Sequence, residues 1–229
     1  MKSLAVLMLL SLLAFPSIGQ DNGYVALGIG PSIPMGAYAS TEEKNEKAGF
    51  ATTGFLAEIS FGYKLVNTIG IGATIRSQMN GFNEKAFTDI FNAIDPTASI
   101  SMTSESYKSI GFLAGLYGSF PRSDGNSSLD IRGQIGVLRC QTGDLNFNLN
   151  YMGSSGTIKF EGTTSSSLAY LIGVGYKLNV GDLICLNIGL DFQRASPEFV
   201  HVNPITGESE KFEQDISTFN VTIGVGLRI

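Results

Sequence analysis

Residues 219–229 read FNVTIGVGLRI, and in this stretch every odd position is large and apolar. Every even position is small, polar or charged. An alternation of period two indicates a β-strand whose two faces differ chemically. The question that decides the fold is whether the apolar face meets an enclosed core or membrane hydrocarbon.

The same alternation recurs in seven further segments, so the sequence predicts eight strands. These segments are residues 24–34, 55–64, 69–76, 110–120, 129–137, 168–178 and 184–193. Short connections at 66–67, 121–127 and 179–182 alternate with longer ones at 35–49, 80–106, after Cys140 and at 195–215. An even strand count with short turns on one side and long loops on the other is typical of an outer-membrane barrel.

The distribution of charge predicts which face of each strand is wet. Charged residues make up only 15% of the chain, against about 25% in an average soluble domain. A soluble barrel would need a charged outer wall, and the apolar faces of eight strands could not all fit inside a narrow barrel. Charged residues within the strands lie on the polar faces, whereas Lys108, Arg139 and Arg194 share the apolar parity only at loop ends. We therefore predict an all-β fold, an eight-stranded antiparallel up-and-down transmembrane β-barrel.

The first residues have the pattern of a secretory signal peptide. Lys2 precedes an apolar stretch, and Ser17-Ile18-Gly19 forms a small-x-small cleavage motif. We expect a signal peptide at 1–19 and an outer-membrane β-barrel domain at 20–229. A formal net charge of −5 argues against nucleic acid as a partner.

Three segments carry a resemblance to a known family. They are GIGPSIPMG at 28–36, GFATTGF at 49–55 and the terminal VTIGVGLRI at 221–229. The chain resembles the small Gram-negative outer-membrane β-barrel family, similar to the OmpA, OmpX and OmpW barrels of the porin family. The resemblance implies location in the cell outer membrane with periplasmic termini, contact with outer-membrane lipid, and recognition of the terminal strand by the barrel-assembly machinery. It differs at Ile229, where many such barrels end in Phe.

Charged residues on the polar faces predict ion pairs inside the barrel. Glu58 and Arg76 flank a short turn and face one another or lie diagonally on adjacent strands, within reach of long side chains. The candidate lumen ion pairs involve Glu58, Arg76, Asp130, Arg132 and Asp191. Either they plug the lumen, or they form a gate or ion-binding site.

The segment after Cys140 predicts a candidate partner surface. Its apolar residues Leu145, Phe147, Leu149, Tyr151, Ile158 and Phe160 keep the lipid-facing parity of their strands. We expect the fifth and sixth strands to continue beyond the membrane as a hairpin with an apolar stripe outside, unless other loops cover it. Residues 84–94 predict a short amphipathic helix that caps the barrel mouth.

The two cysteines and the histidine do not indicate a catalytic or metal site. Cys140 and Cys185 fall near opposite rims, so we expect no disulfide between them, and with one histidine a structural metal site is not expected. His201 lies in a predicted solvated loop without the spacing of a catalytic triad. We predict a non-enzymatic monomer without a cofactor or metal, acting through its loops and hairpin on an extracellular or envelope protein. The alternatives are OmpW-like passage of small hydrophobic molecules and, third, a lipid A-modifying enzyme.

Overall fold

The computed structural model describes residues 22–94, 98–123, 125–151, 154–202 and 207–229. The predicted signal peptide lies outside these residues. Eight strands close a barrel: β1 (Gly23–Met35), β2 (Ala51–Val66), β3 (Ile69–Phe82), β5 (Tyr107–Pro121), β6 (Ser127–Gln141), β9 (Thr164–Val180), β10 (Ile184–Ala195) and β13 (Ile216–Arg228). Among the described residues, no helix combines the length and apolar character needed to cross a membrane.

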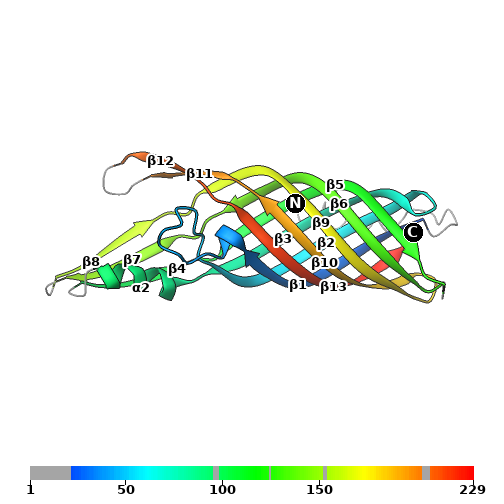
Figure 1. Ribbon diagram of the computed structural model, residues 1–229, viewed down its shortest axis with the longest axis horizontal. Coiled ribbons are helices and arrows are strands. Elements are labelled where there is room, and N and C mark those ends of the chain that lie inside the picture. Colours follow the sequence, from blue (N-terminus) through cyan, green and yellow to red (C-terminus); the bar gives the residue numbers. More distant parts are fainter. Residues whose placement is uncertain (1–21, 95–97, 124, 152–153, 203–206) are drawn as a thin grey trace, which may run out of the picture.

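Each barrel strand pairs with its neighbours in the chain, and antiparallel pairing of β1 with β13 closes the sheet. The short connections β2–β3, β5–β6 and β9–β10 gather at one end, which we call the short-turn end (Figure 1). There Gly181 takes a positive φ of 71° in the tight β9–β10 turn, a conformation that favours glycine. The other four connections leave from the opposite, long-loop end. The predicted eight-stranded up-and-down barrel is confirmed.

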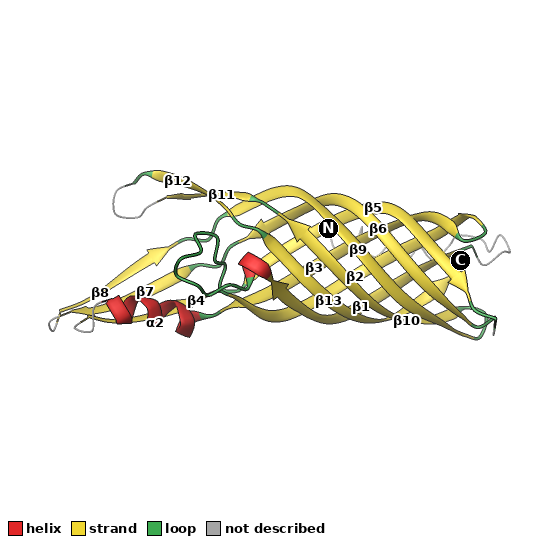
Figure 2. Ribbon diagram, viewed as in Figure 1, coloured by secondary structure: helices red, strands yellow, loops and turns green. Residues whose placement is uncertain are grey.

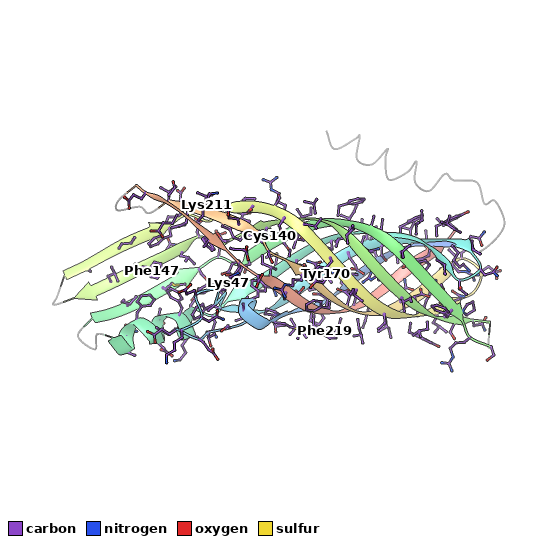
Figure 3. All side chains as sticks on the ribbon, turned by 45° about the horizontal axis from the view of Figure 1, so that its top comes forward. Lys47, Cys140, Phe147, Tyr170, Lys211 and Phe219 are labelled. Atoms are coloured by element: carbon purple, nitrogen blue, oxygen red, sulfur yellow. The ribbon has the colours of Figure 1, made fainter. Side chains whose placement is uncertain are left out.

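The two faces of the barrel wall differ as the alternation predicts. On β9, Leu168 is 73% exposed and Ile172 is 63% exposed, whereas Leu171 between them is 1% exposed. Side chains cover the outer wall densely, including the labelled Tyr170 and Phe219 (Figure 3). An apolar wall of this extent is compatible with hydrocarbon as its solvent, because a barrel pairs every strand and leaves no sheet edge in the lipid.

In the part of the chain that the structure describes, five further strands and two helices do not belong to the barrel wall. The 3₁₀ helix η1 (Gly36–Tyr38) follows β1, and α2 (Glu84–Ile94) follows β3. Strands β4 (Ala98–Ser104), β7 (Leu145–Tyr151) and β8 (Ser154–Phe160) form a three-stranded sheet, and β11 (Glu198–Val202) pairs with β12 (Ser209–Glu213). Figure 2 shows the three-stranded sheet and α2 projecting well beyond the long-loop end. We call β4, β7, β8 and α2 together the extension.

The sequence interpretation predicts α2 and the β7–β8 hairpin but treats β4, β11 and β12 as loop, which is wrong. Ile100 and Met102 alternate with serine and threonine in β4, so a weak strand signal is present in a polar context. The helix also differs from expectation. It packs along β4 in the extension and does not lie across the barrel mouth (Figure 1).

Candidate functional site

Four barrel strands bring two arginines and two carboxylates together in the middle of the lumen. Arg76 from β3 is 1% exposed. Its Nη1 donates to Asp191 Oδ1 at 2.9 Å and to Gln193 Oε1 at 3.0 Å. Its Nη2 donates to Asp191 Oδ2 at 2.9 Å and to Glu58 Oε2. Arg132 donates to Glu58 Oε1 at 3.1 Å and to Asp191 Oδ2 at 2.7 Å. We call Glu58, Arg76, Arg132 and Asp191 the lumen charge network.

The charges of this network cancel, and each carboxylate accepts from both arginines. Buried charges persist in proteins when they are paired with opposite charges, and of the Arg76 guanidinium only Nε has no hydrogen-bond partner among the described residues. The Arg76–Asp191 pair is bidentate, the geometry in which a guanidinium binds a carboxylate most strongly. The network joins side chains of β2, β3, β6 and β10 across the lumen.

An amide and hydroxyl layer extends the network toward the long-loop end. Gln78 Nε2 donates to Asn220 Oδ1 at 3.0 Å and to the Ser32 and Thr218 hydroxyls at 3.2 Å each. Gln193 Nε2 donates to Gln78 Oε1 at 2.9 Å. These amides lie on the same polar parity as the charged residues. That parity is the signal by which the sequence could have assigned them to the lumen.

Asp130 belongs to a different cluster, nearer the short-turn end. Its carboxylate accepts from the hydroxyls of Tyr117 at 2.9 Å and Ser119 at 2.7 Å, and pairs with Lys177 Nζ at 3.1 Å. Lys177 Nζ also lies 4.6 Å from the ring centroid of Tyr24. The sequence analysis groups five charged residues as candidate lumen ion pairs. The structure places four of them in the lumen charge network and Asp130 in this second cluster.

Strand pairing explains why these residues meet. Glu58 and Arg76 are direct partners across the β2–β3 hairpin. Arg132 is opposite Gly173 on β9, and a Cβ at Gly173 would lie 3.1 Å from the Arg132 Nε and 2.9 Å from the Asp191 Cβ. Glycine at 173 thus leaves the space through which the Arg132 side chain reaches Asp191.

Above the polar layers, apolar side chains pack inside the long-loop end of the barrel. This core contains Tyr38, Ala51, Leu113, Leu138, Cys140, Ala169, Leu171, Ala195, Phe199 and Ile216. The lumen therefore holds large apolar side chains as well as polar and charged ones. The cavity beside Glu58 and Arg132 measures about 50 Å³, and a wider one of about 200 Å³ opens at the short-turn mouth.

The cysteines and the histidine lie apart from the lumen charge network. Cys140 and Cys185 are buried and free, on β6 and β10. His201 is in strand β11 rather than in a loop, and its ring stacks on Phe160 at 5.1 Å between ring centroids. Its Nε2 is buried without a hydrogen-bond partner among the described residues. Within the described ranges, that nitrogen therefore has neither a nucleophile nor an orienting carboxylate as a partner.

In the extension, the apolar residues of the β7–β8 hairpin share one face of the sheet. Leu145, Phe147 and Leu149 of β7 and Ile158 and Phe160 of β8 are half-buried. The Phe87 ring of α2 lies 5.9 Å from the Phe147 ring. Phe87 thus covers part of the apolar stripe, which is the alternative that the sequence left open, namely cover by another loop. Tyr151 ends β7, and its side chain lies outside the described residues.

The two edges of the three-stranded sheet differ in whether other groups bind their free backbone amides and carbonyls. Side chains of α2 cover the outer edge of β4: Asn92 accepts from the Ile100 amide at 2.9 Å and donates to its carbonyl at 3.2 Å. Glu84 Oε1 accepts from the Ser104 amide at 2.6 Å. On the described residues of β8, no second strand pairs with the opposite edge. An unpaired edge is a template for another strand.

Asp144 makes two contacts at the base of the extension, and these contacts predict that the stability of the extension depends on pH. Its Oδ1 accepts from the Gly162 amide at 2.8 Å, and its Oδ2 pairs with Lys159 Nζ at 2.7 Å. The hydrogen bond from Lys159, followed by that from the Gly162 amide, lowers the Asp144 pKa. Because the folded pKa lies below the unfolded value, this stabilisation is present at neutral pH and is lost as the pH falls through the folded pKa.

We expect amide hydrogen exchange in residues 145–160 to accelerate as the pH is lowered below about 4, after correction for the intrinsic rate. Asp144→Asn removes the titrating group and should abolish this acceleration. The same acceleration in the Asn variant would assign it to another group.

No family model and no curated protein matches the chain. Among solved structures, Ail, the attachment invasion locus protein of Yersinia pestis, is 16% identical with a TM-score of 0.43, over 92% of this chain and 100% of that one. Neisserial surface protein A is 14% identical with a TM-score of 0.44, over 92% and 98%. OprG of Pseudomonas aeruginosa is 11% identical with a TM-score of 0.49, over 91% and 96%.

The class of this protein follows from its own strand pairing and side-chain distribution. The sheet closes with eight antiparallel strands, the outer wall is apolar, and the interior holds polar and charged side chains next to an apolar core at the long-loop end. These are the properties of an eight-stranded outer-membrane β-barrel. The fold alone does not decide what such a barrel binds or whether it catalyses a reaction.

Proposed function

We propose that the protein is a non-enzymatic surface protein of the outer membrane that binds an extracellular or envelope protein through its extension. In this proposal residues 1–19 are a removed signal peptide. The mature chain is a monomer inserted by the barrel-assembly machinery, with both termini in the periplasm. The long-loop end, including the extension, then faces the cell exterior.

The observation that carries the proposal is the unequal protection of the two sheet edges. Asn92 and Glu84 occupy backbone groups on the β4 edge, whereas β8 presents its edge without an equivalent cover among the described residues. Peptides commonly bind by adding a strand to such an edge. The polar face beside it carries Asn146, Asn148 and Thr157, whose amides and hydroxyls can add side-chain hydrogen bonds.

Two alternatives receive less support. The lumen charge network and the apolar core above it occupy the middle and the long-loop end of the lumen, which disfavours passage of small hydrophobic molecules along its axis. Lipid A modification would need an activated nucleophile. The unpartnered Nε2 of His201 does not supply the base for one.

Site-specific photo-crosslinking tests the proposal. We expect a photoreactive residue at Ser155 or Thr157 of β8, in intact cells, to give a protein adduct of one defined mass. Ser101 and Thr103 of β4 lie on the same sheet beside its covered edge and serve as matched positions. They should give at least fivefold less adduct. Equal adducts from both strands, or none from β8, would contradict edge binding.

A further inference from the structure

A cationic depression lies on the outer barrel wall, immediately above the apolar belt at the long-loop end. Its volume is about 280 Å³, and its lining includes Ser77, Lys108, Ile110, Arg139, Gln141 and Thr164. Lys108 and Arg139 occur on lipid-facing positions of β5 and β6, and the large outward-facing side chains from there toward the short-turn end are apolar. Neither contributes to the lumen charge network.

Register places the two cations side by side. Lys108 is opposite Gln141 and Arg139 is opposite Ile110, so the cations are diagonal neighbours across the β5–β6 pair. Diagonal neighbours on one face of a sheet have Cα atoms about 7–8 Å apart, within reach of long side chains. Two such side chains can therefore converge on one anion.

The charge balance of the depression favours an anion. Arg139 is exposed and has no ion-pair partner among the described residues. Lys108 Nζ lies 3.2 Å from Glu105 Oε2, with both side chains about half exposed. A pair this exposed contributes little free energy, so a dianionic phosphate can compete for Lys108.

The surroundings determine the kind of anion. Directly below the cations, Ile110 is 56% exposed, Val137 55% and Leu168 73%. Gln141, opposite Lys108, and Thr164, opposite Gln141, supply amide and hydroxyl groups toward the long-loop end, and Ser77 lies opposite Ile110. A ligand that fills both zones needs a phosphate at the membrane surface and an acyl chain below it.

We propose that Lys108 and Arg139 form a binding site for the headgroup phosphate of an anionic membrane lipid, whose acyl chain lies on Ile110, Val137 and Leu168. The site is separate from the extension. The lipid-binding proposal therefore does not depend on the proposed surface interaction. It fixes one lipid at a defined position on the β5–β6 wall.

The experiment measures lipid binding to the full chain in detergent micelles by native mass spectrometry. The probes are dioleoylphosphatidic acid and the zwitterionic dioleoylphosphatidylcholine. Each cation near an anionic lipid contributes about fivefold to affinity, so K108Q/R139Q should weaken phosphatidic acid binding about 25-fold and leave phosphatidylcholine unchanged. E105Q removes the competing carboxylate and should strengthen phosphatidic acid binding, an effect that misfolding cannot produce.

The matched control is K44Q/R122Q, which removes the same charge from two exposed positions elsewhere. An equal loss of phosphatidic acid binding in this control would show a general charge effect and overturn the site. Unchanged binding in K108Q/R139Q would also overturn it. Displacement of the lipid by millimolar inorganic phosphate would indicate a free-anion site and refute the lipid assignment.

Discussion

Replacing Arg76 by methionine should lower the unfolding free energy of the barrel by about 3–5 kcal/mol, the cost of breaking a buried ion pair by removing one partner. The substitution leaves Glu58 and Asp191 with one cation, Arg132, between them. One buried carboxylate is then left without a compensating cation, which is the costly arrangement. Urea unfolding from lipid vesicles measures the change.

Charge restoration distinguishes this effect from a simple loss of packing. In Arg76→Met/Asp191→Asn, one cation and one carboxylate are removed together, so the remaining Glu58–Arg132 pair is neutral. This double variant should be more stable than Arg76→Met. Arg194→Met provides the matched control, because Arg194 pairs with Asp215 on an exposed rim and should cost about 0–1 kcal/mol. A double variant no more stable than Arg76→Met would refute charge imbalance as the cause.

Placing a charge on the lipid face should have the second largest effect. Ile172 is the midpoint of β9 and is 63% exposed on the outer wall. Arginine there must leave its charge in hydrocarbon, and we expect Ile172→Arg to cost about 2–4 kcal/mol. Equilibrium unfolding in vesicles measures this cost.

The position along the same strand supplies the control. Val180 ends β9 at the short-turn rim and is 49% exposed. There the arginine reaches the interface, and Val180→Arg should cost about 0–1 kcal/mol. If the two variants lost equal amounts of unfolding free energy, the cost of the arginine would not depend on its depth in a membrane.

The barrel is predictable from sequence because its signal is local. Alternation of period two marks each strand, and its parity separates Leu171 from Ile172 without knowledge of any distant residue. The Glu58–Arg76 contact is also local, since both residues flank one hairpin. The boundaries of α2 follow from the apolar spacing of Phe87, Ile90, Phe91 and Ile94 and from the proline at 96.

Contacts between distant strands are not predictable in this way. Asp130 and Arg132 share a strand and a parity, but the two-residue step between them places each in a different cluster. Which carboxylate meets Arg76 depends on strand tilt and on closure between β1 and β13. The covered edge of β4 likewise depends on Asn92 and Glu84 reaching back from a helix, and no periodicity encodes that contact.

The central claim is that the apolar wall contacts hydrocarbon, and fluorescence quenching tests it most directly. The chain contains no tryptophan, so Ile172→Trp introduces a single reporter. In vesicles, its emission should be blue-shifted and quenched more strongly by bromines deep in the acyl chains than by bromines near the headgroup. Quenching by aqueous iodide, with no effect of the brominated lipids, would contradict the membrane barrel.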